Sequence, residues 1–318
     1  MRQMSRVIDL ELDLPPTNEE EIVGVLKVLM QHRGEPGLAN YLNIFGPRRA
    51  RALGLTLPEV ERMWDELSPQ EFEAALRERA GGLATSLSGF VSELDEAGVE
   101  WGLIEAGSND KTAEIVSQFP HKFIGQAAVN PHDGMKAVRE LERAVRELGL
   151  RSFYASPFRY GIRPNDKKFY PLYAKAAELG IPVFIYCTMN YRTDFPMDLS
   201  HPISLDDVAR DFPEMTIVAD CGGWPWVPDM VAVARRHQNV YIDTAAHRPK
   251  YLATPGSGWE MLMHFGNTLL QDRIVFASGW ANYQMPIKEV VEEMKALPLK
   301  EDVKEKWLYG NAARIFRR

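Results

Sequence analysis

The sequence predicts an α/β fold: one (β/α)8 TIM barrel over residues 1–318, with a helical insertion after the first strand. Three observations support it: eight short apolar runs, helix-like stretches between them, and one long charged, helix-rich stretch at 17–83. The length of 318 residues suits one large α/β domain or two ordinary ones. Strand–helix alternation also fits an open doubly wound sheet, so that alternative stays open.

The apolar runs have the character of buried parallel strands. They are short, rich in branched and aromatic residues, and mostly bounded by polar residues, glycine or proline. In chain order they are Val7–Leu12, Trp101–Ile104, Phe123–Val129, Leu150–Tyr154, Val183–Cys187, Thr216–Ala219, Val240–Ile242 and Ile274–Ala277.

Between these runs, apolar residues recur at the spacing of an α-helix. Asp133–Leu148 repeats apolar residues at helical intervals, and Gly149 follows as a stop signal. Ser204 is a candidate N-cap for Ser204–Phe212, with acidic residues in the first turn. The other predicted helices are Ser86–Glu96, Phe169–Leu179, Lys288–Leu297 and Glu301–Phe316.

The segment 17–83 is too long to be a structureless connection. Leu57–Trp64 and Phe72–Leu76 have the pattern of amphipathic helices. We interpret the segment as an inserted helical subdomain. It is either a lid over the barrel mouth or a peripheral or dimer-forming decoration.

Composition narrows the classes of function. The net charge is −7 and the pI about 5.6, so nothing favours nucleic acid or an anionic membrane as a partner. No apolar segment approaches the length of a membrane span or a signal peptide. The only cysteines, Cys187 and Cys221, fit a reducing compartment, and we expect a cytoplasmic protein.

Eight short motifs follow one another along the chain: Val7–Leu12, Asp95–Val99, Glu178–Ile185, Phe212–Ala219, Gly222-Gly223, Asn239–Thr244, Arg273–Ser278 and Gly310–Phe316. Together they resemble the amidohydrolase-related branch of the amidohydrolase superfamily. That branch contains metal-dependent hydrolases and decarboxylases such as aminocarboxymuconate semialdehyde decarboxylase. The resemblance implies a (β/α)8 barrel whose site lies at the carboxyl ends of the strands.

The usual metal ligands of that family are replaced in this chain. Its first strand usually ends in His-x-His, where this chain has Glu11 and Asp13. Histidines of the fifth and sixth strands correspond to Tyr186 and Asp220, and the aspartate of the eighth to Gly279. Zinc prefers imidazole and thiolate donors, so we expect no zinc and no obligatory cofactor.

Three carboxylates gathered in one barrel mouth cannot all stay ionised without compensation. Glu11, Asp13 and Asp220 could hold an oxygen-ligated cation such as Mg²⁺, Mn²⁺ or Ca²⁺, or pair with a basic side chain. Alternatively, one of them keeps a proton and acts as general acid or base. They are the predicted catalytic residues, together with His247, whose ordinary pKa lies near neutrality.

Residues on the loops after other strands are candidates for binding substrate. Arginine suits the capture of a carboxylate, and aromatic side chains suit a flat or ring-bearing molecule. Tyr186 could donate to an oxyanion or fill the space of a lost ligand, and His201 could be an ordinary loop histidine. The predicted substrate-binding residues are Tyr186, Arg159, Arg192, Arg248, Trp280, Tyr160 and His201.

Two kinds of function remain open. One is an enzyme, nominally a hydrolase and alternatively a decarboxylase or other lyase. It would act on a small carboxylate-bearing substrate, with or without an aromatic ring, by carboxylate acid–base chemistry. The other is an inactive barrel that binds a ligand or partner. Acids at three former ligand positions favour the enzyme, because random replacement in a site that had lost its function would more often leave apolar or small residues. We expect a homodimer or higher homo-oligomer.

Overall fold

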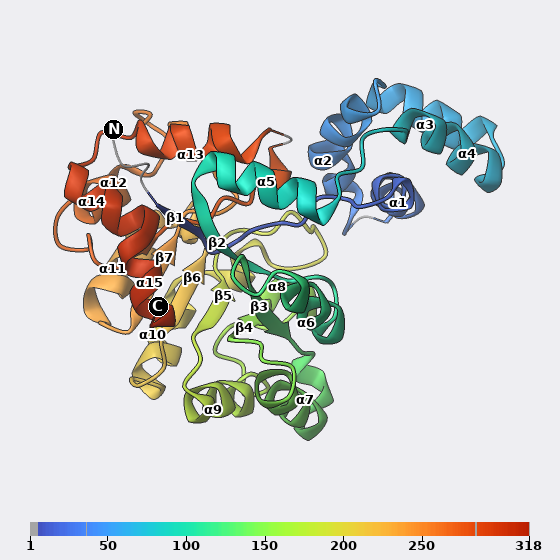
Figure 1. The fold of residues 1–318 in the computed structure, drawn as a ribbon. Coiled ribbons are helices and arrows are strands. Elements are labelled where there is room, and N and C mark those ends of the chain that lie inside the picture. The colour runs from blue at the N-terminus through green and yellow to red at the C-terminus, as the bar shows by residue number, and fades with distance from the viewer. Residues whose placement is uncertain (1–5, 36, 284, 318) are drawn as a thin grey trace.

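Eight parallel strands, hydrogen-bonded in chain order, form the centre of the computed structural model, which describes residues 6–35, 37–283 and 285–317 (Figure 1). The first and last strands close the ring, because the amide of Leu10 donates to the carbonyl of Phe276 at 3.1 Å. The predicted (β/α)8 barrel is therefore confirmed. The strands are β1 (Val7–Asp9), β2 (Val99–Ile104), β3 (Phe123–Ala128), β4 (Ser152–Ala155), β5 (Val183–Tyr186), β6 (Ile217–Asp220), β7 (Val240–Asp243) and β8 (Ile274–Val275).

Strand β1 ends earlier than the apolar pattern predicts. The carboxylate of Asp9 accepts a hydrogen bond from the amide of Glu11 at 3.2 Å. Such a local side-chain bond competes with the sheet ladder and turns the chain. Glu11 and Asp13 therefore stand on the loop just beyond β1, at the carboxyl end of the barrel.

Helices surround the strands and also fill the segment between β1 and β2 (Figure 1). They are α1 (Glu19–Gln31), α2 (Ala39–Ala52), α3 (Leu57–Glu66), α4 (Pro69–Ala80), α5 (Leu87–Ala97), α6 (Asn109–Gln118), α7 (Met135–Arg146), α8 (Pro157–Tyr160), α9 (Tyr170–Leu179), α10 (Ile203–Asp211), α11 (Val227–Arg236), α12 (Glu260–Gly266), α13 (Ile287–Lys295), α14 (Glu301–Glu305) and α15 (Asn311–Phe316). None of these described helices is long and apolar enough to cross a membrane.

The inside of the barrel is packed with side chains. Ile8, Trp101, Phe184 and Val218 belong to one buried apolar cluster. Phe316 of α15 enters the same cluster from the chain's C-terminal region, with its ring centroid 5.4 Å from that of Trp101. The amino-terminal end of the barrel is therefore closed by apolar packing, and chemistry is confined to the opposite end.

The inserted helices α1–α4 form a group beside the barrel (Figure 1) and have an apolar core of their own, which includes Leu26, Phe72 and Leu76. Helices α3 and α4 each begin with a capping box, in which a hydroxyl and a glutamate three residues later satisfy each other's amides. The two connections to the barrel lie together, because the amide of Thr85 donates to the carbonyl of Pro16 at 3.0 Å.

Helix α2 contacts loops at the barrel mouth. The rings of Tyr41 and Phe45 lie 6.0 and 6.5 Å from that of Tyr191, on the loop after β5. The guanidinium of Arg48 donates to the carbonyl of Asn282, on the loop after β8. These contacts place the insertion at the edge of the mouth. Its action as a lid stays a prediction.

Candidate active site

A cluster of acidic side chains lies where β1, β6 and β7 end. One oxygen of Glu11, one oxygen of Asp220 and the sulfur of Cys221 all lie within 4.8 Å of one another. Asp243, the last residue of β7, completes the cluster, and its Oδ1 accepts a hydrogen bond from the amide of Cys221 at 2.8 Å. The structure thus brings together Glu11 and Asp220, two of the three carboxylates that the sequence predicts as neighbours.

Asp220 is the shared hydrogen-bond acceptor of this cluster. Tyr154, which points inward from β4, donates its hydroxyl to Asp220 Oδ2 at 2.9 Å. Burial raises the pKa of Asp220, whereas hydrogen bonds from Tyr154, Glu11 and Cys221 lower it. Because several neighbours donate to it, Asp220 is the member of the cluster best able to stay ionised.

Glu11 is the member best placed to keep a proton. Burial, and then the negative charges of Asp220 and Asp13, raise the pKa of Glu11 well above its ordinary value. Its Oε2 atom is buried and has no hydrogen-bond partner among the described residues. A protonated Glu11 that donates to Asp220 relieves the repulsion between the two carboxyls, and it provides an acid at neutral pH.

Two further carboxylates, Asp9 and Asp243, were not predicted. Asp9 accepts hydrogen bonds from the amides of Ser278 and Glu11, and Asp243 accepts from those of Cys221 and Ala245. Both are fully buried, and burial raises the pKa of Asp9 to about 7. Their place at or near the strand ends was visible in the sequence, but only the structure shows that they tie neighbouring strand ends together.

Asp13 lies apart from the Glu11–Asp220 pair, on the side that faces the insertion. Its Oδ2 accepts from the amide of Ala281 at 3.3 Å, and its carbonyl accepts from the indole of Trp280 at 2.9 Å. Burial raises the pKa of Asp13 to about 6, although the Ala281 bond and the charge of Arg49 lower it. Arg49, on α2, is a cation at the mouth that the sequence did not single out.

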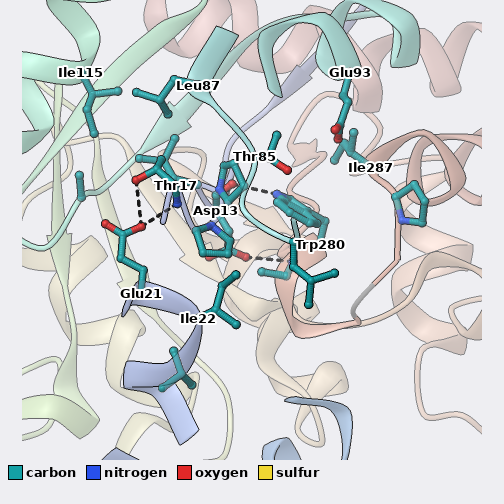
Figure 2. A pocket seen from close by; sticks show the side chains of 18 of the residues that line it. Asp13, Thr17, Glu21, Ile22, Thr85, Leu87, Glu93, Ile115, Trp280 and Ile287 are labelled. Carbon is teal, nitrogen blue, oxygen red and sulfur yellow. Dashed lines mark hydrogen bonds between the residues drawn. The ribbon is translucent and has the colours of Figure 1, made fainter. Parts of the chain in front are cut away.

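A cleft of about 1170 Å³ leads to this side of the mouth (Figure 2). Its walls come from the loop after β1, helices α1, α2, α5 and α6, and the start of α13. Asp13 and Trp280 face it together with Thr17, whose amide and hydroxyl donate to Glu21 at 2.8 and 3.2 Å (Figure 2). Among the described residues, Asp13 lines the cleft whereas Glu11, Asp220 and Asp243 do not, so the cleft is an approach to the acid cluster rather than its centre.

The two predicted histidines lie among tryptophans. The ring of His247 is 5.6 Å from Trp224 and 4.8 Å from Trp259, and burial lowers its pKa to about 4. It is therefore a neutral imidazole at pH 7, unlike the near-neutral group expected from the sequence. His201 packs 4.6 Å from the ring of Trp226. A catalytic role for His247 and a binding role for His201 stay predictions.

The two predicted tyrosines lie on the side of β4 and β5. Tyr186 donates to the carbonyl of Met189 at 3.0 Å, and its ring packs 4.5 Å from that of Phe158. Burial raises the pKa of Tyr186, and the nearby charges of Cys221 and Asp220 add to this, so the side chain faces the cluster as a neutral phenol. Tyr160 is half-buried on α8, beside Arg159.

The three predicted arginines do not neutralise the acid cluster. Each pairs with an acid elsewhere: Arg159 with Glu105 at 3.8 Å, Arg192 with Asp194 at 2.5 Å and Arg248 with Glu293 at 2.5 Å. Their binding of a substrate carboxylate stays a prediction. The compensation that the carboxylates need must come from protons, from Arg49 near Asp13, or from a bound cation.

A barrel with a buried acid cluster at the carboxyl ends of its strands has the architecture of a barrel enzyme. Residues 84–318 match the amidohydrolase family, and the chain belongs to that family. It is thus an amidohydrolase-family enzyme, as the sequence motifs indicated.

Several known proteins are similar to the chain. A 2-amino-3-carboxymuconate-6-semialdehyde decarboxylase of Dictyostelium discoideum is 31% identical over 78 residues, which are 24% of this chain and 22% of that protein. The match thus spans about a fifth of that relative's length.

Solved structures extend the likeness to the whole fold. An uncharacterised TIM-barrel protein of Bordetella bronchiseptica is 24% identical over 98% of both chains, with a TM-score of 0.69. The 5-carboxyvanillate decarboxylase of Sphingomonas paucimobilis is 19% identical, covering 98% of this chain and 99% of that one, with a TM-score of 0.63. A 5-carboxyvanillate decarboxylase of Novosphingobium aromaticivorans, with bound manganese, is 17% identical over 100% and 98%, also with a TM-score of 0.63.

Proposed function

We propose that the protein is a decarboxylase that removes carbon dioxide from a small, carboxylate-bearing aromatic or unsaturated molecule. The observation that carries this proposal is the buried Glu11–Asp220 pair, in which burial and the neighbouring negative charges raise the pKa of Glu11 well above its ordinary value. The decarboxylase names of the curated relative and of similar structures favour this lyase over the hydrolase expected first from the sequence.

Glu11 is the proposed general acid. It gives its proton to the carbon that carries the carboxylate, the bond from that carbon to the carboxylate breaks, and the electron pair of this bond restores the unsaturated system. Carbon dioxide leaves, and Glu11 regains a proton from solvent. A positioned general acid contributes about 10²–10⁴-fold to a rate.

The neighbours of Glu11 set its protonation. Asp220, held by Tyr154, stays ionised and keeps the proton on Glu11. Tyr186 and Tyr154 supply neutral hydroxyl groups at the edge of the cluster, because burial raises the pKa of each. The mouth faces the cleft through Asp13 and Trp280, where a flat substrate can pack against the indole.

The donor set also fits a divalent cation. Glu11 and Asp220 would hold it, since their oxygens lie close together and Glu11 Oε2 has no partner among the described residues. Glu11 would then be ionised as a ligand, so proton donation by Glu11 belongs to the metal-free site. Such an ion would supply positive charge that binds and polarises substrate oxygens.

The test is turnover with the acids that the relatives' names suggest: 5-carboxyvanillate, 2,6-dihydroxybenzoate and related aromatic carboxylates. We expect release of carbon dioxide and, in D₂O, one deuterium at the carbon that lost the carboxylate. Glu11→Gln should reduce kcat at least 100-fold, whereas the exposed Glu66→Gln should leave it unchanged.

Three results would contradict the proposal. Full activity of Glu11→Gln would remove Glu11 as the acid. Ligand binding without turnover of any such carboxylate would favour the inactive barrel, and water-dependent cleavage of an ester or amide would favour the hydrolase.

A further inference from the structure

Cys221 lies inside the barrel, although strand alternation predicts that it points away from the interior. Strand β6 ends at Asp220, and Cys221 takes a left-handed backbone conformation with φ of 64°. This conformation is uncommon for a residue other than glycine, and it breaks the alternation of the strand. The thiol is therefore buried in the acid cluster, with its sulfur 3.5 Å from Asp220 Oδ1.

The positions of three donor atoms suit a single ion. An oxygen of Glu11, an oxygen of Asp220 and the sulfur of Cys221 lie within 4.8 Å of one another. Ligands that each stand about 2.0–2.4 Å from one metal ion are separated by no more than roughly this distance.

A buried carboxyl beside the three donor atoms gives an independent observation. Asp243 is 0% exposed, and its Oδ2 has no hydrogen-bond partner among the described residues. Burial, and then the charge of Asp220, raise the pKa of Asp243 well above its ordinary value. A buried acceptor without a donor destabilises the fold, and more so when it is charged. A cation bound beside Asp220 would offset this cost.

We propose that Glu11, Asp220 and Cys221 form a mixed oxygen–sulfur site for a divalent transition-metal ion, such as Co²⁺ or Zn²⁺, in preference to Mg²⁺ or Ca²⁺. The thiol of Cys221 thus reverses the expectation from the sequence that zinc does not bind. Thiolate sulfur disfavours the hard cations that an all-oxygen site accepts. Binding displaces the thiol proton to solvent, and the thiolate then donates an electron pair to the metal. This inference rests on the cation site of the proposed function and not on decarboxylation itself.

Cobalt reports directly on the sulfur ligand. Chelator-treated full-length protein is titrated with Co²⁺ while absorbance is recorded. We expect an intense near-ultraviolet sulfur-to-cobalt charge-transfer band that saturates at one Co²⁺ per chain. A 100-fold excess of Mg²⁺ should not displace the cobalt.

Variants separate the two buried thiols. Cys221→Gly suits the positive φ and removes the sulfur, so it should fold but lose the band and bind Co²⁺ at least tenfold more weakly. Cys221→Ser should behave likewise. Cys187→Ser is the matched control, because Cys187 is also buried but lies 3.8 Å from the sulfur of Met230. It should keep the band.

Three results would overturn the proposal: Co²⁺ binding to the wild type without the band, a band that survives in folded Cys221→Gly, or no binding of Co²⁺ at all. Failure of decarboxylation is a separate outcome. Absent turnover with an intact band would reject the reaction and leave the metal site standing.

Discussion

Replacing Asp9 with asparagine tests how much the buried acids cost the fold. Asp9 is fully buried, its Oδ1 accepts two amide hydrogen bonds, and its Oδ2 has no partner among the described residues. Burial raises its pKa from an ordinary 3.8 to about 7. Asparagine keeps an acceptor for both amides but cannot ionise.

The size and sign of the effect follow from proton linkage. Between about pH 4 and pH 7, Asp9 is protonated in the folded chain and ionised in the unfolded one. The free energy of unfolding therefore falls as pH rises through this window. A shift of about three pKa units, at about 1.36 kcal/mol each, corresponds to roughly 4 kcal/mol. Wild type should lose this much stability between pH 4 and pH 7, whereas the asparagine variant should not.

The assay is urea unfolding at pH 4, 5, 6, 7 and 8 in the presence of a chelator. We expect the free energy of unfolding of Asp9→Asn, minus that of wild type, to rise by about 4 kcal/mol between pH 4 and pH 8. A new buried amide nitrogen adds a cost of about 1–3 kcal/mol that does not depend on pH. The exposed Asp302→Asn is the control and should track wild type. A stability difference that stays constant across the range would refute the reasoning.

Three further changes test other parts of the molecule. Burial lowers the pKa of the His247 imidazole to about 4, so wild type should lose about 3 kcal/mol of unfolding free energy as the pH falls from 6.5 to 4. His247→Phe should abolish this loss, as measured by urea unfolding. Tyr154→Phe removes a donor 2.9 Å from Asp220, so the acidic limb of the pH–rate profile should move up by about 1–2 pH units. Gly102→Ala should destabilise the fold by about 1–3 kcal/mol in thermal unfolding, because its Cβ would overlap the side chain of Leu12.

For each of these three variants, one result would contradict the prediction. Unchanged acid sensitivity in His247→Phe would show that another group titrates, and an unmoved acidic limb in Tyr154→Phe would show that Asp220 does not govern activity. For the glycine, the comparison is Gly24→Ala, where no atom lies within 4 Å of the new Cβ. Equal effects of the two alanines would reject the packing argument.

The barrel could be predicted because its signals are local. Buried parallel strands leave short apolar runs, and each predicted run overlaps an observed strand. The residues at which the strands end were less predictable, since they depend on single side chains. Asp9 bonds the amide of Glu11 and ends β1 early, and Cys221 changes the backbone conformation just after β6.

The site was predictable only in part, because proximity between strands is not a local property. Placing Glu11 and Asp220 at the ends of strands was enough to bring them together. Arg49 could not be assigned to the mouth, because it lies on the insertion, and only its packing shows that its charge acts on Asp13. The three arginines on mouth loops fit the expected position but find acidic partners of their own.

The position of Phe316 has a consequence for synthesis of the chain. Its ring packs against Trp101 inside the barrel, and its carbonyl accepts a hydrogen bond from Arg151 at 2.7 Å. Strand β1 likewise meets β8 only after the six strands between them have been made. The barrel therefore cannot close before β8 has been made, and a truncated product that stops before α15 should leave the apolar cluster around Trp101 uncovered for chaperones and proteases to recognise.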